Sequence, residues 1–217
     1  MVLGVYGAGG LGREVFILAS QINKVSSSWE KIVFIDDITQ ATTLYNNPIY
    51  SFNRFKDIFD IGNTEVIIAL GEPIYREMLA KKVSEYGFKL ATLIHPSVYI
   101  PEDTTIEEGC IIHANVSISS NIILNKNVLL QPMTVIGHDS IIEENTVISA
   151  LASVAGNCKI GKTVFIAVSV PIKEKISIGN NTIVGMGAVV LNNIEDNVVA
   201  VGNPARALRK NDGIVFK

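Results

Sequence analysis

The sequence lacks the features that would place the protein in a membrane, outside the cell or on nucleic acid. No apolar run approaches the length of about 20 residues that a transmembrane helix needs. The first residues enter a strand directly, without the basic and then apolar segment of a signal peptide. The formal net charge of -3 provides no basic excess for a nucleic-acid partner. We therefore expect a cytoplasmic protein that binds neither membrane nor nucleic acid.

Cysteine and charge are also scarce. The two cysteines, Cys110 and Cys158, both fall on an inward position of the repeat described next, so we expect buried thiols rather than a disulfide, a metal pair or a nucleophile. No metal site is expected. With 48% hydrophobic and 18% charged residues the chain is globular, and its 217 residues allow one large or two small domains.

A six-residue repeat fills the second half of the chain. Every sixth residue is Ile, Leu or Val at seventeen consecutive steps: Ile94, Ile100, Ile106, Ile112, Ile118, Leu124, Leu130, Ile136, Ile142, Ile148, Val154, Ile160, Ile166, Ile172, Ile178, Val184, Val190. A helix repeats at about 3.6 and a half-buried strand at 2, so this period indicates a parallel β-helix of hexapeptide type. We call these residues the ladder and expect them to point inward, with three hexapeptides in each coil.

The position two residues before each ladder residue supports this interpretation. It is mostly small or β-branched, which suits a narrow interior with pleated walls. The residues are Thr92, Val98, Thr104, Cys110, Val116, Ile122, Val128, Thr134, Ser140, Thr146, Ala152, Cys158, Val164, Val170, Ile176, Thr182 and Ala188.

The first ninety residues have a different pattern, in which apolar strands alternate with helices. A strand from Val2 to Tyr6 runs into a glycine turn, Gly7-Ala-Gly-Gly-Leu-Gly12, and then a helix that includes Val15 to Ile22. Glycine lets a phosphate approach the backbone N–H groups, and the helix N-terminus adds positive charge. A glycine turn can also be only structural, but its flanking strand and helix favour a nucleotide site.

Three further strands complete this region. They span residues 31–35, 65–70 and 89–94, and a helix begins at Pro73, continues to about Tyr86 and is capped by Gly87. Such alternation predicts a parallel α/β sheet, but only half of a dinucleotide-binding fold, which suits a nucleoside diphosphate better than NAD. Asp36 and Asp37 end the second strand, where carboxylates can bind ribose or base; a solvated turn is the alternative.

The three histidines have different positions in the repeat. His95 precedes Pro96 at the junction, where a cap role is expected, and His113 is expected at the surface. His138 lies two residues after ladder residue Ile136, which places it at an outward corner near the middle of the prism, next to Asp139. A surface histidine would be unremarkable there, yet imidazole is the side chain best suited to proton transfer near neutral pH.

Five motifs in order carry a resemblance to a known family: Gly7-Ala-Gly-Gly-Leu-Gly12, Phe34-Ile-Asp-Asp37, Gly137-His-Asp139, Ala155-Gly-Asn157 and Gly202-Asn-Pro-Ala-Arg206. The chain resembles the hexapeptide-repeat sugar acyltransferases, the group that contains N-acetyltransferases of nucleotide-linked amino sugars and sialic-acid O-acetyltransferases. The resemblance covers residues 2 to 208. It implies a Rossmann-like half domain in residues 1–90, a left-handed parallel β-helix in 91–208 and a tail in 209–217.

The resemblance also implies a reaction and its residues. His138 would be the catalytic base and Asp139 its acidic neighbour, in a cleft between subunits of a homotrimer. Acetyl-CoA would be the cosubstrate and a nucleotide-linked amino sugar the acceptor. The nucleotide sugar would contact Gly9, Gly10, Leu11, Asp36, Asp37 and Gly71. The acetyl-CoA would contact Val168, Gly185, Met186, Gly187, Pro204 and Arg206.

Two positions depart from the family pattern. Val147 stands where some relatives have a histidine that contacts acetyl-CoA, and Gln131 stands where a relative has asparagine. Among the possible activities we favour N-acetylation, most simply of a 4-amino-4,6-dideoxyhexose. The alternatives are O-acetylation or longer-chain acylation of a related sugar such as sialic acid, a nucleotide-binding trimer without activity, and a small NAD-dependent oxidoreductase. The ladder and the half-sized nucleotide domain disfavour the oxidoreductase, and His138 with Asp139 disfavours the inactive trimer.

Overall fold

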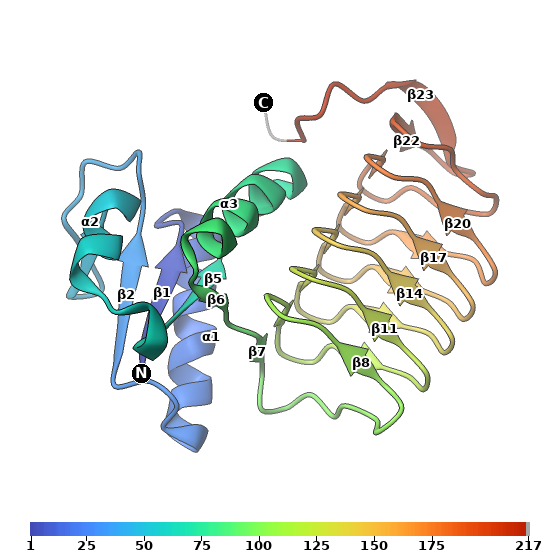
Figure 1. The fold of residues 1–217 in the computed structure, drawn as a ribbon. Coiled ribbons are helices and arrows are strands. Elements are labelled where there is room, and N and C mark those ends of the chain that lie inside the picture. Colours follow the sequence, from blue (N-terminus) through green and yellow to red (C-terminus); the bar gives the residue numbers. More distant parts are fainter. Residues whose placement is uncertain (216–217) are drawn as a thin grey trace.

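The computed structural model describes residues 1–215, in which an α/β domain packs beside a prism of stacked parallel strands (Figure 1). The predicted fold class, an α/β domain followed by a parallel β-helix, is confirmed. None of the helices in this part of the chain is long and apolar enough to span a bilayer.

Six strands form the sheet of the α/β domain in the order β3-β4-β2-β1-β5-β6. All pair in parallel except β3, which is antiparallel to β4. Helix α1 packs on one face of the sheet, and α2 and α3 pack on the other. The elements are β1 (Val2–Tyr6), α1 (Gly10–Ser26), β2 (Lys31–Ile35), β3 (Thr43–Leu44), β4 (Asn47–Tyr50), α2 (Phe52–Ile58), the 3-10 turn η1 (Ile61–Asn63), β5 (Thr64–Ile68), α3 (Pro73–Tyr86) and β6 (Lys89–Leu90).

Helix α3 has the boundaries that its end signals predict, with Pro73 in the first turn and Gly87 in the left-handed conformation (φ 107°) after the last. The single strand predicted over residues 89–94 is wrong. The Ala91 N–H still donates to Val66 of the first sheet, but the Leu93 N–H donates to Cys110 of the prism. The chain therefore changes sheets within this stretch and forms two strands, β6 and β7 (Leu93–Ile94).

Three sheets form the prism, and they meet at three rows of corners. Sheet one contains β7, β9 (Ile111–Ile112), β12 (Leu129–Leu130), β15 (Val147–Ile148), β18 (Phe165–Ile166), β21 (Ile183–Val184), β22 (Val198–Val201) and β23 (Arg206–Lys210). Sheet two contains β8 (Thr105–Ile106), β11 (Ile123–Leu124), β14 (Ile141–Ile142), β17 (Lys159–Ile160) and β20 (Ser177–Ile178). Sheet three contains β10 (Ser117–Ile118), β13 (Val135–Ile136), β16 (Ser153–Val154) and β19 (Pro171–Ile172).

Neighbouring strands from β7 to β21 are one coil apart in each sheet. Leu130 pairs with Ile112 on one side and Ile148 on the other, an offset of 18 residues, so three hexapeptides make one coil as predicted. The ladder is at most 8% exposed from Ile112 to Val190. Both cysteines are buried and free, and burial raises the pKa of Cys110 to about 12.

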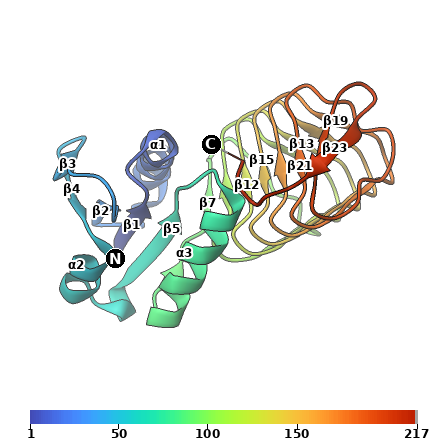
Figure 2. The same cartoon turned by 90° about the horizontal axis from the view of Figure 1, so that it is seen from above.

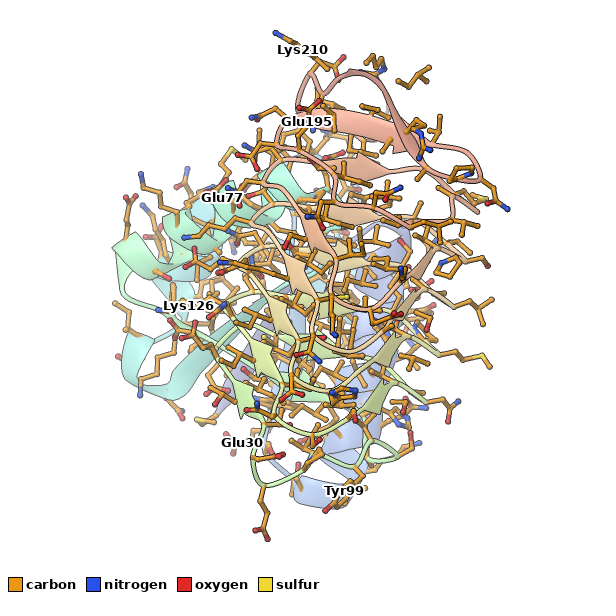
Figure 3. All side chains as sticks on the ribbon, turned by 90° about the vertical axis from the view of Figure 1, so that its right-hand side faces the viewer. Glu30, Glu77, Tyr99, Lys126, Glu195 and Lys210 are labelled. Carbon is orange, nitrogen blue, oxygen red and sulfur yellow. The ribbon has the colours of Figure 1, made fainter. Side chains whose placement is uncertain are left out.

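The inward pattern fails at the first coil. Ile94, Ile100 and Ile106 are only partly buried, and Thr92, predicted to point inward, is exposed. These residues lie where the chain enters the prism, so no earlier coil covers them. Figure 3 shows Tyr99 at this end of the prism and Lys210 at the other.

From the corner after Ile106 to the corner after Val184, each corner turns at a residue with a positive φ, three positions after the ladder residue. These residues run from Gly109 through Asn115 and Asn121 to Gly187 in steps of six. Asparagine tolerates this left-handed region better than most residues, which explains its abundance in the repeat. The corners place side chains outward at regular heights along the prism.

The α/β domain covers the outer face of sheet one, which is the side of the prism nearer to it in Figure 2. Outward residues of this sheet join Val15, Leu18 and Ala19 of α1 in one apolar cluster. They are Leu93, Ile111, Leu129, Val147, Phe165 and Ile183. This contact fixes the α/β domain against the prism.

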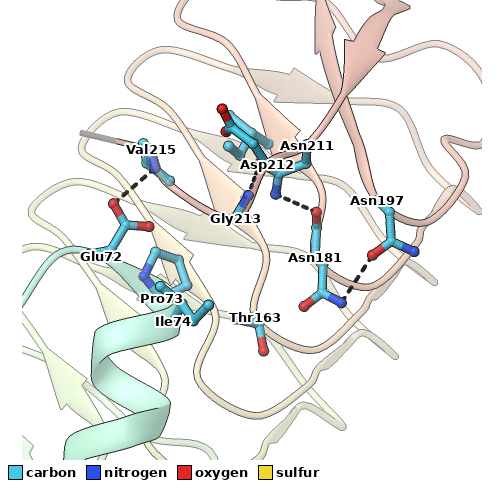
Figure 4. A pocket seen from close by; sticks show the side chains of 11 residues that line it. Glu72, Pro73, Ile74, Thr163, Asn181, Asn197, Asn211, Asp212, Gly213 and Val215 are labelled. Atoms are coloured by element: carbon cyan, nitrogen blue, oxygen red, sulfur yellow. Dashed lines mark hydrogen bonds between the residues drawn. The ribbon is translucent and has the colours of Figure 1, made fainter. Parts of the chain in front are cut away.

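The chain ends in a hairpin and a return segment. Strand β23 includes residues 209 and 210, so the tail predicted from residue 209 begins inside the hairpin. From there the chain runs back to α3, where the Val215 N–H donates to Glu72 Oε2 at 2.9 Å (Figure 4). The last two residues of the predicted tail, 216 and 217, lie outside the described part.

Candidate active site

His138 lies at the corner that follows β13, and 56% of its side chain is exposed. Its Nδ1 is 2.7 Å from Asp139 Oδ2. One coil earlier, Asn121 Nδ2 donates to Asp139 Oδ1 at 2.7 Å. Hydrogen bonds from Asn121 and then from His138 lower the pKa of Asp139, so the carboxylate is ionised near neutral pH. Because a carboxylate only accepts, Nδ1 carries a proton and the lone pair of the neutral ring lies on Nε2.

Gly156, on the next coil, lies directly against the imidazole ring. A Cβ at this position would lie 2.5 Å from His138 Nε2 and 2.7 Å from Cε1, closer than atoms approach without a bond. Asn157 next to it donates its N–H to the His138 carbonyl at 2.7 Å. The ring can therefore hold this orientation only because residue 156 has no side chain.

The glycine turn before α1 has two kinds of glycine. A Cβ at Gly12 would lie 2.0 Å from the Gly7 carbonyl oxygen, so Gly12 allows helix and strand to pack closely. A Cβ at Gly9 or Gly10 would meet no protein atom within 4 Å, and both residues are exposed. Helix α1 starts here with no acidic residue in its first turn and with Leu11 half-buried. Its first N–H groups thus face open space that can receive an anionic group.

A cavity of about 490 Å³ opens beside this turn, at the carboxyl ends of β1, β2 and β5. Its walls come from the ends of these strands and from α3: Tyr6, Gly7, Asp36, Asp37, Ile38, Leu70, Tyr75, Met78, Leu79 and Lys82. We call it the nucleotide pocket, after the nucleotide site that the sequence predicts beside the glycine turn. Gly71 follows Leu70 at its edge and is half-buried.

The two aspartates in this pocket are already hydrogen-bonded to the chain. Asp36 accepts the Ala8 N–H at 2.8 Å and the N–H groups of Ile38 and Thr39 at 2.9 Å each. It therefore connects the glycine turn to the loop after β2. Three hydrogen bonds leave part of its accepting capacity for a ligand.

Asp37 belongs to a cluster with Tyr6 and Lys82. Its Oδ1 accepts the Phe52 N–H at 2.8 Å, and its Oδ2 accepts from the Tyr6 hydroxyl and from Lys82 Nζ at 2.9 Å. Burial alone would raise the pKa of Asp37, but the hydrogen bonds from Tyr6, Phe52 and Lys82 outweigh it, and the pKa is lowered. Burial and then Asp37 raise the pKa of Tyr6. The pocket therefore carries one cation next to one carboxylate, among walls that are largely apolar.

The residues predicted to contact acetyl-CoA gather at the far end of the prism. Val168 and Met186 lie one coil apart in the corner row after sheet one, where the Gly187 N–H donates to Val168 O at 3.1 Å. Met186 is 77% exposed. The neighbouring Gly185 donates its N–H to Ala200 of β22 at 2.8 Å.

Pro204 and Arg206 belong to the hairpin beside this corner row. The Ala205 N–H between them donates to Val189 O at 2.8 Å, and Arg206 Nη1 donates to Ala205 O at 2.9 Å. The structure thus brings the predicted acetyl-CoA residues together. It does not bring them to His138 in one chain, because His138 lies in the corner row on the other side of sheet three.

The two positions that depart from the family pattern lie on sheet one and its corner. Val147 is 1% exposed and belongs to the apolar cluster under the α/β domain, so a ligand cannot reach it in this arrangement. Gln131 is half-buried, and its Oε1 accepts the Ala150 N–H at 3.2 Å.

The prediction for His113 is wrong. It is 6% exposed because α1 packs over its corner, and burial, followed by the nearby His95, lowers its pKa to about 4. Nothing within residues 1–215 forms a hydrogen bond with its Nε2. His95 Nδ1 lies 2.8 Å from the hydroxyl of Ser97, which closes the turn at the domain junction, as expected for a cap.

Among the wall residues of the nucleotide pocket that were not predicted, three have polar side chains: Tyr6, Tyr75 and Lys82. They come from β1 and α3, and Lys82 Nζ lies 2.9 Å from the hydroxyl of Tyr6, 76 residues away. One signal was available in the sequence. Tyr75, Met78 and Lys82 are spaced three and four apart, which puts them on one face of the predicted helix.

The fold and the site define a class, the hexapeptide-repeat acyltransferases with a nucleotide-binding half domain. Residues 2–83 match the family model described as the PglD N-terminal domain. WeeI from Acinetobacter baumannii AYE is 31% identical over 96% of this chain and all (100%) of its own, with a TM-score of 0.89. The acetyltransferase domain of PglB from Neisseria gonorrhoeae FA1090 is 27% identical over 95% of this chain and 99% of its own, with a TM-score of 0.89.

The same PglB domain has been solved with acetyl coenzyme A, at 24% identity and a TM-score of 0.72 over 95% of this chain and 98% of its own; that likeness supports the fold. A curated relative, the GDP-perosamine N-acetyltransferase of Escherichia coli O157:H7, is 29% identical over 54% of this chain. The match spans about half, 53%, of that relative. The chain therefore belongs to the hexapeptide-repeat sugar acyltransferase family that includes WeeI and the PglB acetyltransferase domain.

Proposed function

We propose that the protein transfers the acetyl group of acetyl-CoA to the amine of a nucleotide-linked amino sugar, most simply a 4-amino-4,6-dideoxyhexose. One observation carries the proposal. His138 is held by Asp139 with its Nε2 lone pair free, at an exposed corner, in a chain that also contains a nucleotide pocket. The names of the PglB domain and of GDP-perosamine N-acetyltransferase support the reaction type.

His138 acts as the general base. The acceptor amine attacks the thioester carbonyl carbon, and its proton passes to His138 Nε2 while the carbon–sulfur bond breaks. The thiolate of CoA leaves and takes up the proton, so the products are the amide and CoA. General-base help of this kind is worth about 10²–10⁴-fold. Asp139 stabilises the imidazolium that forms.

The nucleotide pocket holds the acceptor. The diphosphate lies at Gly9, Gly10 and Leu11, where the start of α1 offers free N–H groups and no side chain intrudes. The nucleoside lies against Asp36 and Asp37, and the edge at Gly71 closes the site. The sugar then extends from the pocket toward His138 of a neighbouring chain, because His138 of the same chain lies at the corner opposite sheet one, on which the α/β domain packs.

The acetyl-CoA lies along the corner row with Val168 and Gly185 to Gly187, and its nucleotide end reaches Pro204 and Arg206. The PglB domain solved with acetyl coenzyme A supports this cosubstrate. Exposed apolar residues follow the same corner row and the adjoining sheet three: Met133, Val135, Leu151 and Met186.

An assembly of chains completes the site. The exposed apolar residues fit a homotrimer in which the corner row of one chain faces His138 of its neighbour. We also propose the domain boundaries 1–90, 91–208 and 209–217. The two free thiols fit a reducing cytoplasm.

The test is a thiol-release assay with acetyl-CoA and a panel of UDP-, dTDP- and GDP-linked 4-amino sugars, with 4-hydroxy sugars and sialic acid in parallel. Release with an amino sugar, and an amide in the product, supports the proposal. Release only with hydroxy sugars would replace it with O-acetylation, and the absence of release with every acceptor would exclude acetyl transfer to these sugars.

A further inference from the structure

Arg76 in the first turns of α3 is a fully buried cation, with 0% of its surface exposed. A guanidinium has five N–H donors, and the structure gives it five hydrogen bonds. Nη1 donates to Ile68 O at 2.6 Å and Leu70 O at 3.1 Å. Nη2 donates to the carbonyl and the side-chain oxygen of Asn127 at 2.7 Å each, and Nε donates to the same carbonyl at 3.2 Å. No donor of this side chain is left unused.

The five hydrogen bonds share four acceptors, and all four are uncharged oxygens. A buried cation without a carboxylate is costly to desolvate, so its retention suggests a specific geometric role rather than a gain in stability. Burial lowers the pKa of Arg76 to about 9, which still leaves it charged near neutral pH. The charge strengthens each hydrogen bond to the carbonyl groups.

The two ends of the guanidinium belong to different domains. Ile68 ends β5, and Leu70 follows in the wall of the nucleotide pocket. Asn127 is a left-handed corner residue of the prism (φ 58°), 1% exposed, and its Nδ2 donates to Asn145 of the next coil at 2.8 Å. One planar group therefore connects the wall of the pocket to two coils of the β-helix.

Helix α3 is the element through which this connection can affect the acceptor. Its residues Tyr75, Met78 and Lys82 line the nucleotide pocket, while Arg76 on another face of the same helix points to the prism. A small rotation of α3 about the Arg76 contact would therefore move the pocket relative to every corner of the prism.

We infer that Arg76 is a positioning residue, which sets the orientation of the nucleotide pocket on the β-helix and hence the approach of the acceptor amine to His138 of a neighbouring chain. The inference rests on the proposed function for its catalytic consequence, but the domain orientation can be measured without activity. Misplacement of reacting groups by about 1 Å can cost 10²-fold in rate.

The test compares Arg76→Lys and Asn127→Gly with a matched control, Arg54→Lys, at an exposed position of α2. Lysine keeps the charge but has three donors in place of a five-donor fork. Glycine keeps the left-handed backbone and the carbonyl acceptor, and removes the side-chain oxygen together with the Nδ2 donor to Asn145. If Arg76→Lys does not fold, Asn127→Gly carries the test, since it leaves four of the five hydrogen bonds possible.

Two readouts are needed. Spin labels at Lys56→Cys on α2 and Lys159→Cys on β17 report the distance between the domains, and the native thiols are buried. We expect a shifted or broadened distance distribution in both variants and not in the control. In the acetyl-transfer assay we expect kcat to fall about 10- to 10²-fold, with KM for acetyl-CoA and the Kd for the nucleoside diphosphate within about threefold of the parent values.

The outcomes separate the two proposals. Unchanged distances and a kcat within about twofold of the parent value in folded variants would overturn the inference. Loss of nucleotide affinity with an unchanged distance would also overturn it, because Arg76 would then only shape the pocket. If the parent protein transfers acetyl to no sugar, the proposed function fails, and the distance measurement still decides whether Arg76 sets the domain orientation.

Discussion

The two parts of the candidate site are built from contacts of different range. In the β-helix, His138 contacts the adjacent Asp139 and, one coil away, Gly156, and Asn121 and Asp139 are 18 residues apart. In the α/β domain, Tyr6 contacts Asp37 and Lys82 across 31 and 76 residues. The corner with His138 is therefore fixed by neighbouring coils, whereas the nucleotide pocket depends on how β1, β2 and α3 pack. Substitutions around His138 should therefore act locally, and substitutions around the nucleotide pocket should act through the arrangement of the α/β domain.

The largest effect is expected in the ladder, where two adjacent isoleucines of β14 differ only in the face they occupy. Ile142 points inward and is 0% exposed, and Ile141 is half-buried on the outside. We expect Ile142→Ala to cost about 2–5 kcal/mol of unfolding free energy and Ile141→Ala about 1 kcal/mol. Denaturant unfolding of the two variants measures the difference. Equal losses of unfolding free energy in the two variants would contradict the distinction between inward ladder residues and their outward neighbours.

The next effect concerns His113, which joins the prism to α1. Its pKa in the folded protein, about 4, lies below the ordinary value of 6.5, so the unfolded chain binds the proton first. The unfolding free energy is therefore unaffected by protonation of His113 above pH 6.5. It falls as pH drops from 6.5 toward about 4, by about 3 kcal/mol in total. His113→Gln should flatten the stability profile in this window. If the unfolding free energy falls equally with pH in the parent and in the variant, protonation of His113 does not destabilise the folded protein.

The close contact between Gly156 and His138 predicts an effect confined to one corner. Gly156→Ala should displace the imidazole and lower kcat about 10²-fold, because the methyl group would occupy the space beside Nε2. Nucleotide affinity should stay unchanged. The control is the same change in a His138→Ala background, where we expect no further loss. An additive loss there would mean that Gly156 acts independently of the ring.

The smallest effect is expected from the hydrogen bond that orients Asp139. Asn121→Gly keeps the left-handed corner (φ 55°) and removes the donor to Oδ1. The pKa of Asp139 should rise toward its ordinary value, so activity should begin to fall at a higher pH on the acid side. We expect kcat to fall only several-fold, because the hydrogen bond from Asn121 is exposed. A pH–rate profile measures the loss in kcat and the pH at which activity falls. An unshifted acid limb would contradict this role for Asn121.

The difference between contacts of short and long sequence separation also explains which features the sequence could predict. The ladder repeats a local rule, so its buried residues, its 18-residue coil and the corner position of His138 could be read directly. The rule fails only at the first coil, where Thr92 has no earlier neighbour. In the α/β domain the signals for β1, β2 and α3 were sufficient, but β3, β4 and α2 were missed because they are short and show no period. Ser51 did offer a helix cap, since its hydroxyl accepts the Arg54 N–H.

The candidate site shows the same limit. His138 and Asp139 are neighbours in sequence, and Val168 and Met186, which are expected to contact acetyl-CoA, lie one coil apart. Gly156 belonged to a recognised motif, but only the structure places it against the ring. Arg76 and Lys82 could not be predicted, because their partners come from distant segments. His113 was misjudged because the six-residue rule describes the prism alone and says nothing about α1, which covers it.

His138→Ala tests the central claim most directly. The variant should lose at least about 10²-fold in kcat for acetyl transfer, while its affinity for the nucleoside diphosphate, measured by calorimetry, stays nearly unchanged because the nucleotide pocket is elsewhere. A variant that binds the nucleotide and transfers acetyl at the parent rate would show that His138 is only a corner residue, and the proposed mechanism would be wrong.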